Sequence, residues 1–150
     1  MNSWLGSFDI FVKKNEEWEH ETTIQNTIVD SGLNFLREVL RGAITDGEIK
    51  YIAVGTSTAS VSTSQTQLGA ELFRKQIYSK TATGTGQLQS IAIFEDNEAI
   101  GQIREIGVFA GTTASSVSNT GIMISRVLYS KDKTSLESLQ IQRTDTITRS

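Results

Sequence analysis

Alternation with a period of two is clearest in Ser7-Phe8-Asp9-Ile10-Phe11-Val12-Lys13-Lys14, and it sets the class of fold. One side carries Phe8, Ile10 and Val12, which is typical of a β-strand with one buried face. After an acidic turn, residues 18–25 alternate in the same way. Residues 1–28 therefore predict an N-terminal hairpin.

The period changes after residue 28. Asp30 or Ser31 can cap a helix, and Gly42 is placed to end it. We predict one amphipathic helix over residues 30–41. An isolated helix of this length is marginal in water, so we expect it to pack on a sheet. The apolar side chains expected to make that contact are Leu33, Leu36 and Leu40.

The rest of the chain, residues 49–150, predicts a β-rich core. With 150 residues in all, one domain is expected. The fold class is mainly β, an antiparallel β-sandwich of about seven to eight strands with the helix near the N-terminus. Residues 68–74 fit either a helical turn or a strand. The strands predicted after the helix cover residues 51–54, 75–81, 88–94, 102–109, 121–129 and 136–148.

Composition excludes several classes of function. The chain has no cysteine, one histidine, and 14 basic against 17 acidic residues. Thiolate chemistry and cysteine-bound metals are excluded, and no basic surplus marks a nucleic-acid partner. No signal peptide or membrane-spanning stretch is readable, so we expect no membrane insertion. We also expect no cofactor.

Catalytic and metal sites have weak candidates. His20 stands between Glu19 and Glu21 on a predicted strand, where neighbouring side chains point to opposite faces. We therefore expect no catalytic dyad there and no enzyme activity. The turn Glu95-Asp96-Asn97-Glu98 gathers four oxygen-bearing side chains, but these are also ordinary turn residues. We expect no metal site.

Charged and aromatic residues suggest interfaces instead. Arginines on the late strands can pair with carboxylates across subunits. A long C-terminal strand with Arg143 and Asp145 two residues apart favours pairing in a symmetric assembly. Trp4 and Trp18 are candidates for stacking on a sugar of a receptor, with packing as the alternative. The predicted interface residues are Arg104, Arg126, Arg143 and Asp145.

Five motifs follow one another along the chain. They are Ile49-Lys50-Tyr51-Ile52-Ala53-Val54-Gly55-Thr56, Gln67-Leu68-Gly69-Ala70-Glu71-Leu72-Phe73-Arg74-Lys75, Arg104-Glu105-Ile106-Gly107-Val108-Phe109, Ser125-Arg126-Val127-Leu128 and Gln142-Arg143-Thr144-Asp145-Thr146-Ile147. Their order, with the opening hairpin and the helix, resembles a family of small tailed-bacteriophage virion proteins, labelled tail-fibre or minor structural proteins. The resemblance implies a β-rich virion part that works as an oligomer. It carries over no catalytic residues.

The sequence therefore predicts a non-enzymatic structural component of a bacteriophage virion, at a tail fibre, baseplate or attachment point. It would be made in the host cytoplasm without a signal peptide and assemble as a homo-oligomer, expected to be a homotrimer, with other virion proteins as partners. One alternative is a carbohydrate- or host-receptor-binding module that binds a host surface glycan through the polar loops 56–66 and 111–119. Another is a head decoration or head-fibre protein.

Overall fold

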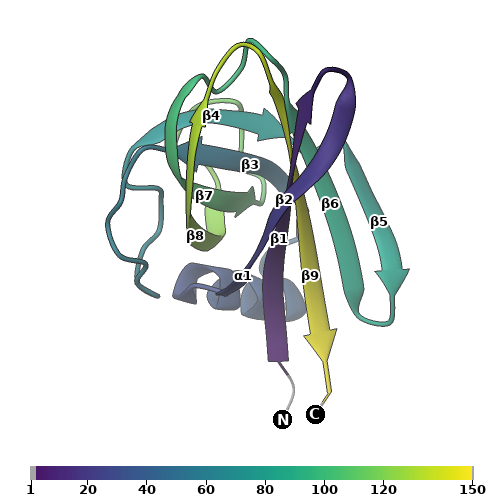
Figure 1. Ribbon diagram of the computed structural model, residues 1–150. Coiled ribbons are helices and arrows are strands. Elements are labelled where there is room, and N and C mark those ends of the chain that lie inside the picture. Colours follow the sequence, from purple (N-terminus) through teal and green to yellow (C-terminus); the bar gives the residue numbers. More distant parts are fainter. Residues whose placement is uncertain (1–2, 150) are drawn as a thin grey trace.

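The computed structural model describes residues 3–149, which form two packed antiparallel sheets and one helix (Figure 1). The predicted fold class is confirmed, with nine strands in the described residues where seven or eight were expected. The elements are β1 (Ser3–Lys14), β2 (Glu17–Thr27), α1 (Asp30–Leu40), β3 (Ile49–Gly55), β4 (Glu71–Gln76), β5 (Ser79–Gly84), β6 (Gln87–Phe94), β7 (Gly101–Ala110), β8 (Ile122–Lys133) and β9 (Ser138–Thr148).

The larger sheet has the strand order β2-β1-β9-β6-β5 and the smaller one β4-β3-β7-β8. The N-terminal hairpin is present as β1 and β2. The C-terminal strand β9 lies between β1 and β6, so both of its edges are hydrogen-bonded. The main core fills the space between the sheets. Its fully buried members include Phe8, Ile10, Ile52, Val54, Phe94, Ile106, Val108 and Ile141.

The extra strand arises where one run of chain changes sheets. Residues 75–81, predicted as a single strand, are divided between β4 and β5. The amide of Ile77 donates to Lys50 of the smaller sheet, and the amide of Tyr78 donates to Ile91 of the larger one. The local period is the same on both sides of this corner, so sequence periodicity cannot reveal it.

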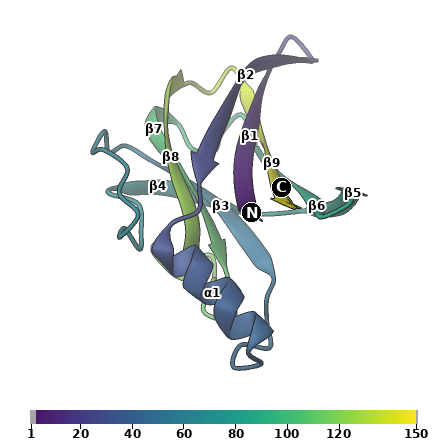
Figure 2. The ribbon, with the colours of Figure 1, turned by 90° about the horizontal axis from the view of Figure 1, so that it is seen from below.

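Helix α1 lies across the lower end of the sandwich against β8 (Figure 2). The predicted side-chain cap is absent: Val29 is the N-cap, and the Ser31 hydroxyl donates to the carbonyl of Met123. A Cβ on Gly32 would lie 2.6 Å from the carbonyl oxygen of Ile124, so this glycine permits the close approach. The helix consequently buries Gly32 and Phe35.

With Gly32 and Phe35 facing the sheet, two of the three leucines of α1 point away from it, so the predicted packing is wrong for those two. Leu33 is 50% exposed and Leu40 is 80% exposed, while Leu36 is half-buried. The residue that anchors the helix in the main core is Phe35. The spacing of the leucines shows that they share one side of the helix. The close contact at Gly32 decides which side of the helix faces the sheet.

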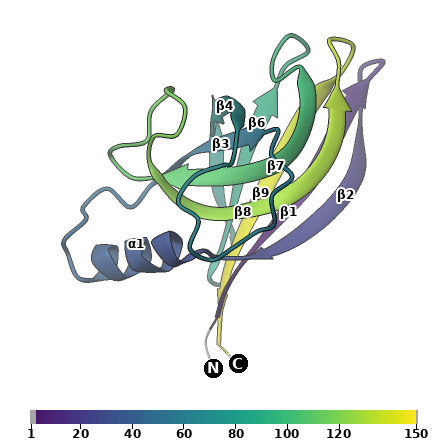
Figure 3. The same cartoon turned by 90° about the vertical axis from the view of Figure 1, so that its left-hand side faces the viewer.

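The outer face of the smaller sheet is covered by the β3–β4 connection, residues 56–70 (Figure 3). Leu68 from this connection is buried in a second, smaller cluster on that face. The tip of the connection is tied to α1, because the amide of Asp30 donates to the carbonyl of Thr63. The buried members of this cluster are Val29, Ala53, Leu68, Phe109 and Met123.

Candidate functional site

An apolar groove of about 500 Å³ lies between α1 and the lower half of the larger sheet. The lower ends of β1, β9, β6 and β5 reach past the smaller sheet, and α1 lies opposite them (Figure 1). The groove is therefore walled by strands on one side and by the helix on the other. Its apolar walls include Trp4, Leu88 and Ile147 from the sheet and Phe35, Leu36 and Val39 from the helix.

Charged residues at the groove already have partners within the chain. The ammonium of Lys80 donates to the carbonyl of Ile49 at 3.0 Å and lies 3.1 Å from a carboxylate oxygen of Glu48. Asp145 accepts a hydrogen bond of 3.0 Å from the indole Nε1 of Trp4. What the groove offers a ligand is mainly apolar surface, which suits an apolar side chain or segment.

Arg143 joins the two sheets next to this groove. Its guanidinium donates to Asp145 through Nη2 at 2.9 Å and, across the core, to the Ser125 hydroxyl at 2.7 Å. It also stacks over the ring of Phe8. Gly6 makes room for it, because a Cβ there would collide with the guanidinium. Arg143 and Asp145, predicted as interface residues, are both buried and have their hydrogen-bond partners inside the chain, although Asp145 reaches the wall of the groove. Their role at an interface stays a prediction.

Glu105 and Arg126 form a second buried ion pair, on the outer side of the smaller sheet. Both side chains are 0% exposed, and Nε of Arg126 lies 2.8 Å from Oε1 of Glu105. The carboxylate also accepts from the amides of Ser57, Gly69 and Ala70 at 2.9–3.0 Å. Arg126 was predicted at an interface between subunits. Its partner is instead a carboxylate of the same chain, and the pair fixes both ends of the 56–70 connection.

The electrostatics of Glu105 reflect this setting. Burial by itself would raise the pKa of its carboxyl. The hydrogen bond from Arg126 and those from the backbone amides outweigh burial, so the pKa is held below its usual value. The group is therefore a carboxylate at neutral pH.

A third ion pair was missed by sequence reasoning. Nε of Arg74 donates to Glu71 at 2.8 Å, and both side chains are almost fully buried. Nη1 of Arg74 donates to the carbonyls of Ser115 and Thr120, and the guanidinium stacks 4.5 Å from the centre of the Phe109 ring. The pair holds residues 111–121 on the same outer face. Its signal in the sequence is a charged pair three residues apart, in a segment whose secondary structure stayed ambiguous.

The remaining predicted contact residues are dispersed. Arg104 pairs with the exposed Asp132 at 2.7 Å and is the one of the four interface candidates that lies near the surface. Trp4 lines the groove, whereas Trp18 is partly exposed near the β1–β2 turn, with Lys13 over its ring. Because Trp18 pairs with Lys13, the two tryptophans lie about 30 Å apart along β1 at the usual strand rise. They are too far apart to stack on the same sugar ring.

The acidic turn at residues 95–98 is neutralised by lysines. The ammonium of Lys75 donates to both carboxylate oxygens of Glu98 at 2.7 Å. The buried ammonium of Lys133 donates to the carbonyls of Glu95 and Asp96. Burial lowers the pKa of Lys133. Within residues 3–149, no group of three or more histidine or acidic side chains is placed to hold a metal ion.

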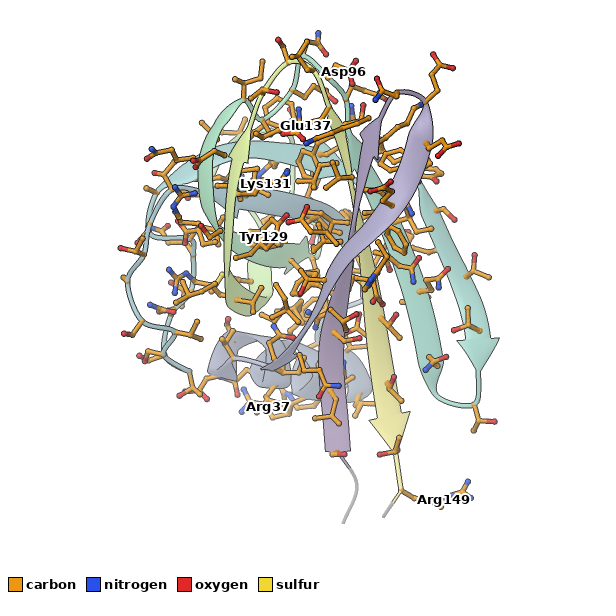
Figure 4. All side chains as sticks on the ribbon, in the orientation of Figure 1. Arg37, Asp96, Tyr129, Lys131, Glu137 and Arg149 are labelled. Carbon is orange, nitrogen blue, oxygen red and sulfur yellow. The ribbon has the colours of Figure 1, made fainter. Side chains whose placement is uncertain are left out.

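The upper end of the molecule also carries a band of charge between β8 and β2. In Figure 4 this band runs downward from Asp96 at the top through Glu137 and Lys131 to Tyr129. Glu21 accepts from the hydroxyl of Tyr129 at 2.9 Å and lies 3.6 Å from Lys131. These contacts close the side of the sandwich at which β2 faces β8. Burial raises the pKa of Tyr129, and the adjacent Glu21 adds to the rise.

His20 has a partner that the sequence did not suggest. Its Nε2 lies 3.0 Å from the carboxylate of Asp9 on β1, and 3.0 Å from the hydroxyl of Thr23. Glu21 points elsewhere, to Tyr129, as the alternation predicted. The Thr23 hydroxyl donates to Asp9 rather than to His20. The side chains of His20 and Thr23 therefore both meet the carboxylate of Asp9, which is not the order of a nucleophile activated by a base.

Comparison of the chain with protein-family models, with curated proteins and with solved structures gives no match. Among the described residues, no helix has the length and apolar character needed to cross a membrane.

Proposed function

We propose that this protein is a non-enzymatic structural component of a bacteriophage virion, part of a tail fibre, baseplate or attachment point, and that it assembles as a homo-oligomer with other virion proteins. It would be located in the virion. The three-fold count expected from the sequence relied on β9 as an available strand. Because β9 is central in its sheet, that count stays a prediction without this support.

One observation carries the proposal: motifs that resemble the virion family converge on one buried network. Glu105 belongs to one motif, Arg126 to another, and Gly69 and Ala70 to a third, and all four meet in hydrogen bonds. The pair of Arg74 and Glu71 lies within the same third motif. Residues that carry the resemblance thus form buried ion pairs and hydrogen bonds that hold long loops on the β-sandwich. This supports a structural part rather than a reactive site.

Mass spectrometry of purified virions, produced from a genome that encodes this chain, tests the proposal. We expect the protein in a fixed ratio to the major virion proteins, and immunogold labelling should place it at the tail. Labelling over the capsid would favour the head decoration alternative. Absence from washed virions would contradict the proposal.

The exposed loops favour a second candidate, the glycan- or receptor-binding module. Residues 56–66 and 111–119 leave opposite ends of their strands but fold back over the same face of the smaller sheet. Most of their polar side chains are exposed. A shallow depression beside the first loop is lined by Gln25, Asn26, Val61, Arg126 and Val127.

A glycan array with the purified protein discriminates the two candidates. Saturable binding that Val61→Asp abolishes would support the receptor-binding module. Leu136→Asp is the matched control, because Leu136 is an exposed apolar residue outside both loops and outside this depression. An array without signal favours the scaffold.

A further inference from the structure

Helix α1 leaves a stripe of leucines uncovered beside the groove. Leu33, Leu36 and Leu40 follow one another at spacings of three and four residues, so they share one side of the helix. Leu33 and Leu40 are exposed, and Leu36 forms part of the groove wall. The exposed stripe is thus continuous with the apolar walls formed by Trp4, Leu88 and Ile147. In the view from below, no other helix or strand of residues 3–149 lies over α1 (Figure 2).

The spacing of this stripe matches itself when reversed. The match is close rather than perfect, because the spacings of three and four reverse to four and three. In an antiparallel pair of α1 helices whose two-fold axis passes beside Leu36, the two copies of Leu36 meet, and Leu33 of each copy lies within one residue of the position opposite Leu40 of the other. Leucines at alternating spacings of three and four are the pattern by which helices interlock side chains. The stripe is therefore complementary to a second copy of itself.

The charges beside the stripe select the antiparallel direction. Asp30 lies in the first turn and is exposed. At the other end, the exposed Arg37 and Arg41 both donate to Glu38, at 2.9 and 2.8 Å, so two positive charges share one carboxylate and that end of the helix keeps a positive surplus. Figure 4 shows Arg37 on the helix at the lower surface. In the antiparallel pair, Asp30 of each copy lies beside Arg41 of the other, and the helix dipoles oppose each other favourably. A parallel pair would set Asp30 against Asp30 and Arg41 against Arg41.

We infer that α1, with the groove beside it, is the surface through which two copies of this chain associate, with the α1 helices antiparallel about a two-fold axis. The contact is isologous: each copy presents the same stripe. The exposed leucines of one copy cover the apolar stripe and the groove mouth of the other. This inference rests on the self-association part of the proposed function and names its surface.

Sedimentation equilibrium of the full chain over about 1–200 µM tests the proposed contact between two α1 helices. The parent chain should pass from monomer to dimer. Leu40→Glu places two charges in the apolar contact and should raise the dimer dissociation constant about 100-fold or more. Leu136→Glu is the matched control, because Leu136 is 83% exposed, close to the 80% of Leu40, at the other end of the molecule. It should leave the dimer intact. Thermal melts of all variants test whether the fold is retained, and we expect melting temperatures close to that of the parent chain.

A charge exchange tests the direction of the helices. Asp30→Lys and Arg41→Glu should each weaken the dimer by about three- to tenfold, and the double variant should recover most of the loss. Recovery requires Asp30 of one copy to lie beside Arg41 of the other, so a double variant that is as weak as the single ones contradicts the antiparallel pair.

The outcomes separate this inference from the wider proposal. An oligomer that Leu40→Glu leaves intact, or a trimer, overturns the two-fold helix contact and leaves the homo-oligomer in place. A parent chain that stays monomeric at every concentration overturns the contact and the self-association together. The presence of the protein in virions is measured separately and does not depend on either result.

Discussion

Replacing Glu105 by glutamine would leave the guanidinium of Arg126 buried without a counter-charge. Removing one partner of a buried ion pair typically costs about 3–5 kcal/mol. We expect Glu105→Gln to lower the free energy of unfolding by about that amount, measured by urea unfolding at neutral pH. Asp132→Asn is the control, since it breaks the exposed pair with Arg104 and should cost less than about 1 kcal/mol. Equal losses in the two variants would contradict a stabilising role of the buried pair of Glu105 and Arg126.

The same carboxylate predicts a dependence on pH. The pKa of Glu105 is lower in the folded chain than the 4.5 of an unperturbed glutamate side chain. Its stabilising contribution is therefore complete above that value and is lost as the pH falls below it, through the folded-state pKa. The difference in unfolding free energy between the parent and Glu105→Gln should be constant from pH 6 to 7, within about 0.5 kcal/mol, and shrink in acid. A difference that grows on acidification would show the opposite sign of shift.

At the level of elements, α1 offers a direct comparison between two of its side chains. Phe35 is the buried anchor, and Leu40 is exposed. Phe35→Ala should cost about 3–5 kcal/mol, because it empties a site in the core. Leu40→Ala should change stability by no more than about 0.5 kcal/mol when the chain is dilute enough to be monomeric. Urea unfolding at low protein concentration measures both, and similar losses would mean that the helix is rotated.

The turn at residues 95–98 should behave as an element stabilised by lysines rather than by a cation. Melting temperatures in EDTA and in excess calcium are expected to agree, because a ligand of the folded state would raise stability by mass action. Lys75→Met, which leaves the Glu98 carboxylate without its ammonium, should lower the melting temperature in both media alike. A shift with calcium in the parent chain would point to a site at this turn.

Sequence reasoning worked where the pattern is local. The alternation in β1 depends only on which face is buried, so it survived folding unchanged. The rotation of α1 did not follow from its leucines, because it depends on how closely Gly32 approaches Ile124, a contact between distant segments. The same limit applies to the candidate site. An arginine on a strand resembles a surface residue until the register of the sheets supplies its partner, as Glu105 does for Arg126.

For the whole molecule, the position of β9 has a clear consequence. β9 is the third of five strands and carries the buried side chains of Leu139 and Ile141 into the core. A chain that ends at Leu136 loses this strand and should not fold. We expect its circular dichroism to lack the cooperative melting of the parent. A truncated chain that still melts cooperatively would contradict the central place of β9.

The pairing of β1 with β9 also determines how the domain answers to mechanical tension. Ser3 pairs with Thr148, so the ends of these two strands leave the fold side by side (Figure 1). Hydrogen bonds between antiparallel strands run perpendicular to the strands. Tension between the two ends therefore acts along these bonds and opens them one at a time, as a zipper opens. Tension between α1 and the turn at residues 95–98, at opposite ends of the sandwich, is shared among many bonds at once. An assembly that transmits force through this domain is therefore most resistant to tension when neighbouring proteins bind at α1 and at the turn of residues 95–98, and when no load acts on the paired ends of β1 and β9.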